Sequence, residues 1–402
     1  MRTSSTLRAI GIAGVLLLLA GCTSTGEDEK QREPLALTIG ALLPQTGAYA
    51  ALAPAQAAGI ELAAQDVNQA ELGITVTVQT RDSGDASTPA VAATSMTDLL
   101  AAKATAVVGA TSTEVSKTVL KTAVAAGVVM ISPQNSDPAF TGIDDDGLYF
   151  RTSPSDALEG ATLGKRIVAD GAKRLGVVML DDEYGSQLRS AVRSGFESAG
   201  GTVAATAKVA ADTTDFAPTV AEIAQGKPDA VVLITGTQST AIVPGLIAAG
   251  IPATSLYFVD RNTLQYGADM PVSLEGATGT LPGPTLDPFF EKRLREFNPA
   301  LTSFAYAPEA YDAVVLLALG ALAADSIKGD AIAAKLRGVS GGTGHGEKAT
   351  DFASAAQIII SGDPVDYDGY SGPIRFDRNG DPAGAVIGFY RYGADNRFVR
   401  LD

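Results

Sequence analysis

TAVVGATSTEVSKTVLKTAVAAGVVMISPQNSDP, residues Thr105–Pro138, contains the pattern that predicts the fold. A short apolar run over Thr105–Gly109 ends in small polar residues, and an Ala-rich segment with helical spacing follows over Glu114–Ala126. A second apolar run, Val128–Ser132, then ends in another polar loop. Continuous apolar runs that alternate with such segments are typical of parallel strands covered on both faces by helices. The stretch therefore predicts a strand–helix–strand unit of an α/β fold.

The same alternation extends on both sides of this stretch, and it restarts near Leu148, which predicts two similar doubly wound, Rossmann-like lobes in series. The further predicted strands are Leu35–Leu43, Ile74–Gln79, Leu148–Thr152, Leu175–Leu180, Thr202–Val209, Ala230–Thr235 and Leu256–Val259. The further predicted helices are Leu52–Asn68, Pro89–Lys103, Leu158–Ala169, Gly185–Ala199, Pro218–Ala224 and Thr240–Ala249.

The C-terminal part departs from this regularity. Helices are predicted over Asp287–Phe297, Pro308–Ala324 and Ala331–Leu336. Acidic residues interrupt the apolar run of the second, so it is predicted to be a buried helix and not a membrane span. Strands predicted over Gly372–Phe376 and Ala385–Tyr392 flank an Asn-Gly turn, which indicates a hairpin.

The hairpin turn, Asp377–Asp381, also invites a calcium-loop interpretation. The hairpin is preferred, because Pro382 and Gly388 stand where such a loop needs glycine and a bidentate glutamate.

The N-terminus has the features of an export signal. Arg2 and Arg8 precede a short apolar core that is too short to span a bilayer. The core ends in Leu-Ala-Gly-Cys22, which resembles the lipobox of bacterial lipoproteins, in which the signal is removed before the Cys and the thiol is lipidated. The alternative is an ordinary secretory peptide with an accidental Cys. The expected arrangement is a signal over 1–21 and a lipidated Cys with a polar tether over 22–34.

Composition narrows the function further. Removal of Arg2 and Arg8 lowers the formal net charge from −15 to −17, which disfavours nucleic acid as a partner. Cys22 is the only Cys and His345 the only His, so no thiolate or His cluster is expected to hold a metal, and no cofactor is expected. Nucleotide-loop and nucleophile-elbow motifs are also missing. These features predict that the protein is not an enzyme.

Polar residues gather where three predicted strands end, and ligands of α/β sheets bind at such ends. The first group precedes the predicted helix at Glu114, where free N–H groups favour an anion and where Ser112 and Thr113 add hydroxyls. Plain capping is the alternative, since Thr111 and Glu114 match a capping box.

The other two groups follow later strands. The loop Ser132–Pro138, with Gln134, Asn135 and Ser136, is stiffened by prolines, and a plain surface loop is the alternative. Tyr184 opens a predicted helix, where it could cover a ligand or only pack.

With these residues the sequence resembles the type I periplasmic binding proteins, in particular the branched-chain amino acid binding proteins. The similarity runs over about Leu35 to Leu401. It is carried by the order and spacing of these stretches: Ile39–Pro44 with Thr46–Tyr49, Gly59–Asn68, Val128–Pro138, Asp182–Gly185, Ala310–Ala313 and Gly372–Pro382.

The resemblance implies two lobes that close on a ligand by a hinge motion, and an interlobe cleft. The expected boundaries are 35–153 with 284–370 for the first lobe and 154–283 with 371–402 for the second. It also implies that Thr113 and Ser136 hold a ligand carboxylate, that the backbone at Gln134 accepts from an ammonium, and that Tyr184 contacts the ligand. Tyr49 lies in the first loop, where the family often places an aromatic residue.

One position matches the family pattern only within a residue or two, and the loop that contains another departs from it. The acidic residue that pairs with the ammonium in the family corresponds here to Asp260, within a residue or two. Gln238 lies in a loop where an aromatic residue is common, so a ligand more polar than leucine or valine is expected.

Taken together, these features predict a monomeric solute-binding lipoprotein of an ABC importer. It is expected outside the cytoplasm, on the membrane through its lipid anchor only, with a small amino acid-like ligand and a transporter permease as partners. A sensor or envelope regulator of the same fold without a transporter is the main alternative, and an extracytoplasmic hydrolase is a second.

Overall fold

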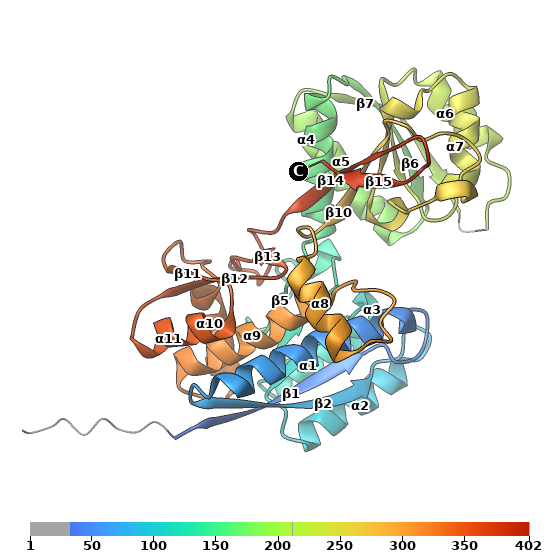
Figure 1. Cartoon of the computed structure of the whole chain (residues 1–402). Coiled ribbons are helices and arrows are strands. Elements are labelled where there is room, and N and C mark those ends of the chain that lie inside the picture. Colours follow the sequence, from blue (N-terminus) through green and yellow to red (C-terminus); the bar gives the residue numbers. More distant parts are fainter. Residues whose placement is uncertain (1–32, 211, 402) are drawn as a thin grey trace, which may run out of the picture. The chain divides into compact units, whose positions relative to one another are not determined.

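The computed structural model describes residues 33–210 and 212–401, and Pro34 onward forms a unit of its own. The predicted signal and Cys22 lie outside the described residues. The described chain contains a five-stranded sheet, a seven-stranded sheet and a small three-stranded sheet. The elements around the five-stranded sheet are called the first lobe below, and those around the seven-stranded sheet the second lobe (Figure 1).

The five-stranded sheet is parallel throughout, with the order β2-β1-β3-β4-β5. Its strands are β1 (Leu35–Leu43), β2 (Ile74–Asp82), β3 (Ala106–Val108), β4 (Val129–Ser132) and β5 (Tyr149–Arg151). Every residue of β3 and β4 is buried, as expected for strands covered by helices on both faces. The predicted strands are confirmed here, and their carboxyl ends open into the polar loops noted in the sequence.

Within the described residues, seven α-helices belong to the first lobe. They are α1 (Ala53–Ala70), α2 (Pro89–Ala101), α3 (Thr113–Ala125), α8 (Pro288–Phe297), α9 (Ala307–Ala324), α10 (Gly329–Val339) and α11 (Phe352–Ile360). Among the described helices, α9 alone is long and apolar enough to cross a membrane by length and composition. Most of it is buried in the first-lobe core, which agrees with the predicted core helix.

The seven-stranded sheet has the order β15-β14-β10-β9-β8-β6-β7. Its parallel strands are β6 (Arg174–Leu180), β7 (Thr202–Val209), β8 (Ala230–Ile234), β9 (Leu256–Phe258) and β10 (Thr278–Pro282). Two antiparallel strands complete it, β14 (Ile387–Tyr392) and β15 (Phe398–Arg400). Its helices are α4 (Asp156–Ala169), α5 (Glu183–Ser198), α6 (Ala217–Gln225) and α7 (Ser239–Ala248).

Helices α4 and α5 pack with their backbones almost in contact. A Cβ atom at Gly164 would lie 2.3 Å from the Val192 carbonyl oxygen, and one at Gly195 would lie 2.2 Å from that of Ala161. Neither position has room for a side chain. Because α4 and α5 both begin at the cavity described below, this contact fixes the two helix starts relative to each other.

The predicted C-terminal hairpin is wrong, although its turn is present. Asp377 N–H donates to the Asp381 carbonyl oxygen at 2.9 Å, and Gly380 has a φ of +76°. The flanking strands separate: β13 (Gly372–Pro373) pairs with β12 (Val365–Gly369), beside β11 (Glu347–Ala349), whereas β14 pairs with β10 and β15. The ladder stops after one bridge because Pro382 has no N–H and Phe376 turns into the first-lobe core.

The chain passes between the lobes three times. It crosses between β5 and α4, between β10 and α8, and again before β14. Ile374 and Phe376 pack in the first-lobe core, which favours a last crossing after Phe376. The expected boundary at 371 is earlier than that, and the division into 35–153 with 284–370 and 154–283 with 371–402 stays a prediction.

Candidate functional site

A cavity of about 390 Å³ is lined by loops that follow strands of both sheets. The first lobe supplies residues after β3 and β4, and the second lobe supplies the start of α4 and residues after β6 and β9. The cavity therefore lies at carboxyl ends of parallel strands, as expected for this fold class. Eight of the nine predicted ligand residues line it: Tyr49, Ser112, Thr113, Gln134, Asn135, Ser136, Tyr184 and Asp260.

The first-lobe end of the cavity contains the N-terminus of α3, which has no side-chain cap. Ser112 is the N-cap residue, and its hydroxyl oxygen is buried without a hydrogen-bond partner within the described part of the chain. Thr111 does not form the capping box, because its hydroxyl donates to Gln56 Oε1 at 3.0 Å. The first N–H groups of a helix have no intrahelical acceptor, so this end offers several donors to an anion.

The loop after β4 is held by its own side chains. Asn135 Oδ1 accepts from the Thr113 hydroxyl at 3.1 Å, and Asn135 Nδ2 donates to Tyr149 OH at 2.8 Å. Gln134 Oε1 accepts from Gln56 Nε2 at 2.8 Å. The amides of Asn135 and Gln134 thus orient the loop, and a ligand would meet the Thr113 hydroxyl and the loop backbone.

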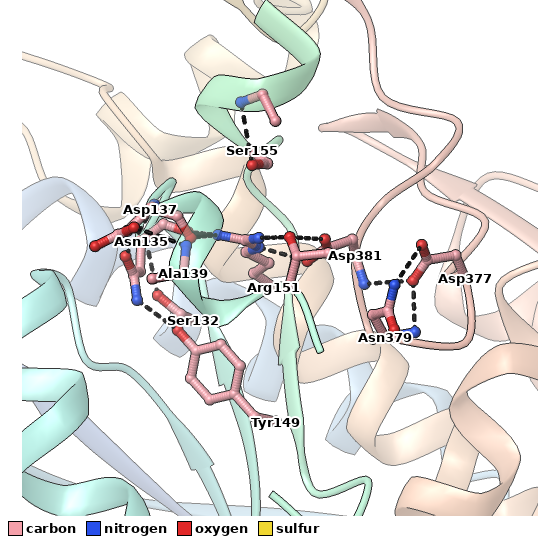
Figure 2. A network of polar contacts seen from close by, with 12 residues as sticks. Ser132, Asn135, Asp137, Ala139, Tyr149, Arg151, Ser155, Asp377, Asn379 and Asp381 are labelled. Atoms are coloured by element: carbon pink, nitrogen blue, oxygen red, sulfur yellow. Dashed lines mark hydrogen bonds and ion pairs between the residues drawn. The ribbon is translucent and has the colours of Figure 1, made fainter. Parts of the chain in front are cut away.

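Arg151 holds this loop in place through hydrogen bonds to its backbone, as Figure 2 shows. Its guanidinium is fully buried and donates to the carbonyl oxygens of Asn135 and Asp137 at 3.2 and 2.8 Å. It also forms an ion pair with Asp381 at 2.6 Å, and Thr141 bonds to both partners. Asp377 accepts from the N–H groups of its own turn, so both carboxylates of the suspected calcium loop are engaged in local structure.

The second-lobe end of the cavity presents a tyrosine and an aspartate. Tyr184 OH donates to Asp260 Oδ1 at 2.5 Å, and the Arg261 guanidinium lies over the Tyr184 ring at 3.5 Å from its centroid. Burial and the neighbouring Asp260 carboxylate raise the pKa of Tyr184 well above its ordinary value, so the phenol stays protonated. Asp260 is thereby oriented by a neutral donor and keeps its other oxygen for a ligand.

Three carboxylates meet at this end. One oxygen from each of Asp156, Glu159 and Asp260 lies within 4.8 Å of the others. Glu159 Oε1 accepts from the Asp260 N–H at 2.9 Å and from the Thr280 hydroxyl at 2.6 Å. Asp156 N–H donates to the Ser136 carbonyl oxygen at 2.9 Å, which links the first-lobe loop to the start of α4.

Burial and the neighbouring Asp260 carboxylate raise the pKa values of Asp156 and Glu159. Burial raises the pKa of Asp156 to about 7, and the adjacent Asp260 carboxylate adds to the effect while a hydrogen bond with Ser136 opposes it. Burial, with Asp260 as the second cause, raises the pKa of Glu159 well above its ordinary value. Arg261 and Arg151 favour the ionised form of Asp156, but burial and the neighbouring carboxylate outweigh them.

Sequence reasoning did not identify Asp156, Glu159 and Tyr306. Asp156 and Glu159 stand in the first turn of α4, where acidic residues are ordinary helix-start residues. Tyr306 precedes α9 with a left-handed φ of 61°, and it lines the cavity. An acidic i, i+3 pair after a strand is a weak signal for the first two, and we found none for Tyr306.

Gln238 is the predicted ligand residue that does not line the cavity. Its Oε1 accepts from Gly236 N–H at 3.2 Å in its own loop, directly before α7. The polar side chains beneath this loop bond to one another, since Asn262 Nδ2 donates to Thr235 and Ser239 at 3.1 and 3.0 Å. The loop is therefore organised by Asn262, and the structure does not bring Gln238 to the other predicted residues.

Comparisons with known proteins agree with this architecture. The model of the periplasmic binding protein family matches residues 36–361, so the chain belongs to that family. Its members are substrate-binding proteins of the extracytoplasmic space. The resemblance to type I periplasmic binding proteins and the α/β fold class predicted from the sequence are confirmed.

A relative of known role and two solved structures illustrate the likeness. The chemotactic signal transduction system substrate-binding protein BasB of Halobacterium salinarum is 27% identical over 365 residues, which cover 84% of this chain and 83% of BasB. A putative branched-chain amino acid ABC transporter from Silicibacter pomeroyi has a TM-score of 0.72 and 18% identity, with 91% and 96% of the two chains covered. An ABC transporter substrate-binding protein from Desulfitobacterium hafniense in complex with Leu has a TM-score of 0.69 and 21% identity, covering 91% and 100%.

Proposed function

We propose that the protein is the solute-binding component of an ABC importer and that it binds an amino acid or a similar small zwitterion in the cavity. The observation that carries this proposal is that the two ends of the cavity suit groups of opposite charge. The uncapped start of α3, with the unpartnered Ser112 hydroxyl, suits a carboxylate. The Asp260 carboxylate at the other end suits an ammonium.

The lining also supports a polar ligand. Among the described lining residues, Ala86 is the one aliphatic side chain, and three are tyrosines: Tyr49, Tyr184 and Tyr306. A leucine or valine side chain would find little apolar surface to bury against, and burial of such a side chain is its main source of affinity. We therefore expect a ligand with a small or polar side chain.

A thermal-shift screen tests the proposal. The chain without its first 22 residues, unfolded and refolded to remove any bound solute, is screened against amino acids, short peptides, amides, polyamines and sugars. A ligand at 100 times its dissociation constant stabilises the fold by about 2.7 kcal/mol, which moves the unfolding midpoint by several degrees. No shift with any amino acid would refute the amino acid assignment.

Two variants test the residues assigned to the ends. Thr113→Ala and Asp260→Ala each remove a hydrogen bond to a charged ligand group, which costs about 1.5–3 kcal/mol of binding free energy. Isothermal titration calorimetry measures the change, with Asp98→Asn on α2 as a control that lies outside the cavity lining. Affinities within twofold of wild type for both variants would show that the ligand binds elsewhere.

BasB favours a second candidate function. That relative is a substrate-binding protein of a chemotactic signal transduction system, and it aligns with most of this chain. The same ligand-dependent closure would then be read by a membrane sensor in place of a permease. Affinity capture of the ligand-bound protein from its own membranes distinguishes the two, because a permease with its ATPase and a transducer protein are different partners.

The proposed location is the outer side of the cell membrane, with Cys22 as the lipid-anchored residue and the following polar segment as a tether. The proposed partners are a small amino acid-like ligand and the permease, without nucleic acid, for a monomer that catalyses no reaction. Metabolic labelling with a fatty acid, compared between wild type and Cys22→Ser, tests the anchor. Equal labelling of both proteins would contradict it.

A further inference from the structure

A second cavity, of about 270 Å³, lies beside the crossings between the lobes and is called the hinge cavity below. One wall is the segment that follows β10 at the second crossing, and another is the segment that leads into α9. Among its described lining residues, Glu309 is the one with a charged side chain, and the others are proline, glycine, alanine, leucine, phenylalanine or tyrosine. The Glu309 carboxylate therefore stands in a largely apolar wall.

Glu309 is buried without a cation beside it. The residue is 8% exposed, and none of the described Lys and Arg residues forms an ion pair with it. Its backbone carbonyl oxygen accepts from the Thr152 hydroxyl at 2.9 Å, which holds the start of α9 and leaves the side chain unused. A Cβ atom at Gly283 would lie 3.4 Å from Glu309 Oε1, so the carboxylate is next to the segment after β10. A proton or a cation from outside the chain is what compensates such a group.

Three aromatic residues line the same cavity: Phe304, Tyr306 and Tyr370. Tyr370 is held in place by Phe290, on which it stacks with the ring centroids 4.0 Å apart. The Arg295 guanidinium lies 4.5 Å from the Phe304 centroid and pairs with Glu291 at 2.8 Å, so it is engaged outside the cavity lining. The faces of aromatic rings attract cations, and their carbon surface stabilises apolar groups.

The dimensions suit a small molecule. An apolar cavity of roughly 150 Å³ is large enough to bind benzene. The hinge cavity exceeds that volume, so it can hold one ring or a short branched chain together with an ammonium group. Apolar walls, aromatic faces and a single carboxylate are together the chemistry that binds an organic ammonium ion.

We propose that the hinge cavity is a second ligand site, which binds a small apolar ammonium ion with Glu309 as its counter-ion. Tyr306 is the one described residue that lines both the hinge cavity and the larger cavity assigned to the transported solute. The two sites therefore use different carboxylates, and this inference stands independently of the proposed function.

The position of the site suggests what its occupant does. Thr152, which bonds to the Glu309 backbone, belongs to the first crossing, and Gly283 of the second crossing lines the cavity. Gly283 N–H donates to the Val386 carbonyl oxygen at 2.8 Å, which joins the second crossing to the third. A bound ammonium ion would thus contact the segments that absorb a hinge motion, and it would favour the lobe arrangement in which the cavity fits it.

The protonation state of Glu309 gives the site a pH dependence. Burial raises the pKa of Glu309 to about 7, a hydrogen bond from its own backbone N–H opposes this, and the Asp312 carboxylate adds to it. The other titratable or charged groups around it are Tyr306, Tyr370 and Arg295 of α8. The ammonium ion binds the ionised carboxylate, so its affinity should rise about tenfold per unit between about pH 5 and 6.5 and level off above pH 7.

Calorimetry with phenethylamine and 3-methylbutylamine, on the chain without its first 22 residues, tests the proposal. The alcohols 2-phenylethanol and 3-methylbutanol are the matched neutral probes. At pH 8 both amines are cations and are expected to bind. The alcohols should bind at least about tenfold more weakly, because they leave Glu309 without a cation.

Four variants locate the binding. Glu309→Gln keeps the shape of the protonated acid, and it should bind the amines at least about tenfold more weakly and without the pH dependence. Glu296→Gln, an exposed acid-to-amide change on α8, is the matched control and should bind as wild type does. Asp260→Ala removes the carboxylate assigned to the larger cavity and should also bind the amines as wild type does. Ala305→Leu fills the hinge cavity with Glu309 intact and should abolish binding, which keeps the test decisive if Glu309→Gln does not fold.

Thermal midpoints verify that each variant is folded, and four outcomes would overturn the inference. If neither amine binds wild type at millimolar concentration, the cavity is not a site for ammonium ions. If the alcohols bind as tightly as the amines, the site does not select charge. If folded Glu309→Gln or Ala305→Leu binds the amines as wild type does, they bind elsewhere. If Asp260→Ala abolishes their binding, they occupy the larger cavity.

Discussion

Replacement of Arg151 by methionine is expected to lower stability by about 3 kcal/mol. The side chain is fully buried and donates to Asp381 at 2.6 Å and to two carbonyl oxygens of the loop after β4. Loss of one partner of a buried ion pair costs about 3–5 kcal/mol, because the other charge stays buried and unpaired. The lower end applies here, since Asp381 retains 16% exposure and a hydrogen bond from Thr141.

Urea unfolding of the ligand-free protein measures this cost. Arg193→Met is the matched control, because Arg193 pairs with Glu197 on an exposed face and such a pair contributes at most about 1 kcal/mol. The double variant Arg151→Met, Asp381→Asn should recover part of the loss, since the orphaned carboxylate is then removed. A cost below 1 kcal/mol for Arg151→Met, or strict additivity in the double variant, would refute the reasoning.

The Arg151→Met variant is also expected to bind its ligand more weakly. Arg151 holds the carbonyl groups of Asn135 and Asp137, so its loss frees the loop that faces the ligand. Affinity should fall even under conditions in which the variant is fully folded, because the loop must then be ordered when the ligand binds. Unchanged affinity in the folded variant would show that the loop keeps its shape without Arg151.

Three further predictions concern other parts of the site. Ser112→Ala should weaken binding by about 1–3 kcal/mol in calorimetry and leave the unfolding midpoint of the ligand-free protein unchanged, because the Ser112 side chain forms no capping hydrogen bond to α3; a lowered midpoint would contradict this. The raised pKa of Asp156 means that its contribution to stability is lost between pH 4 and 7, so from pH 5 to 8 wild type should lose about 3 kcal/mol relative to Asp156→Asn in urea unfolding; parallel curves would contradict it. Gly164→Ala should cost about 1–3 kcal/mol, since its Cβ would meet the Val192 carbonyl, and a neutral result would mean that α4 can move away from α5.

Sequence patterns located most elements of residues 35–260, because strands buried on both faces are uninterrupted apolar runs. Beyond that point they located α8, α9, α10 and β14 but missed other elements. The strand Thr278–Pro282 has the sequence TGTLP, in which Gly and Pro indicate a turn, and its place in the sheet depends on pairing with β9 and β14. The helix Phe352–Ile360 is short, and its N-cap Asp351 is a common loop residue. Only tertiary contacts define these elements.

The candidate site shows the same limit. The rule that ligands bind at the carboxyl ends of strands located residues such as Thr113, Tyr184 and Asp260, because it needs only the order of elements. It says nothing of where a side chain points, and the Gln238 side chain accepts a hydrogen bond from Gly236 of its own loop. Glu159 was missed because its partner Asp260 lies 101 residues away.

The Arg151–Asp381 ion pair affects the order in which the site forms during synthesis. Its partners are separated by 230 residues, and Asp381 follows all the parallel strands of both large sheets. During synthesis, most strands of both sheets are made before Asp381, whose ion pair with Arg151 holds the loop after β4. A fragment that ends before Asp381 would still contain every parallel strand, yet it would lack the anchor of that loop. The geometry of that loop therefore depends on a contact that forms only after the parallel strands of both sheets have been made.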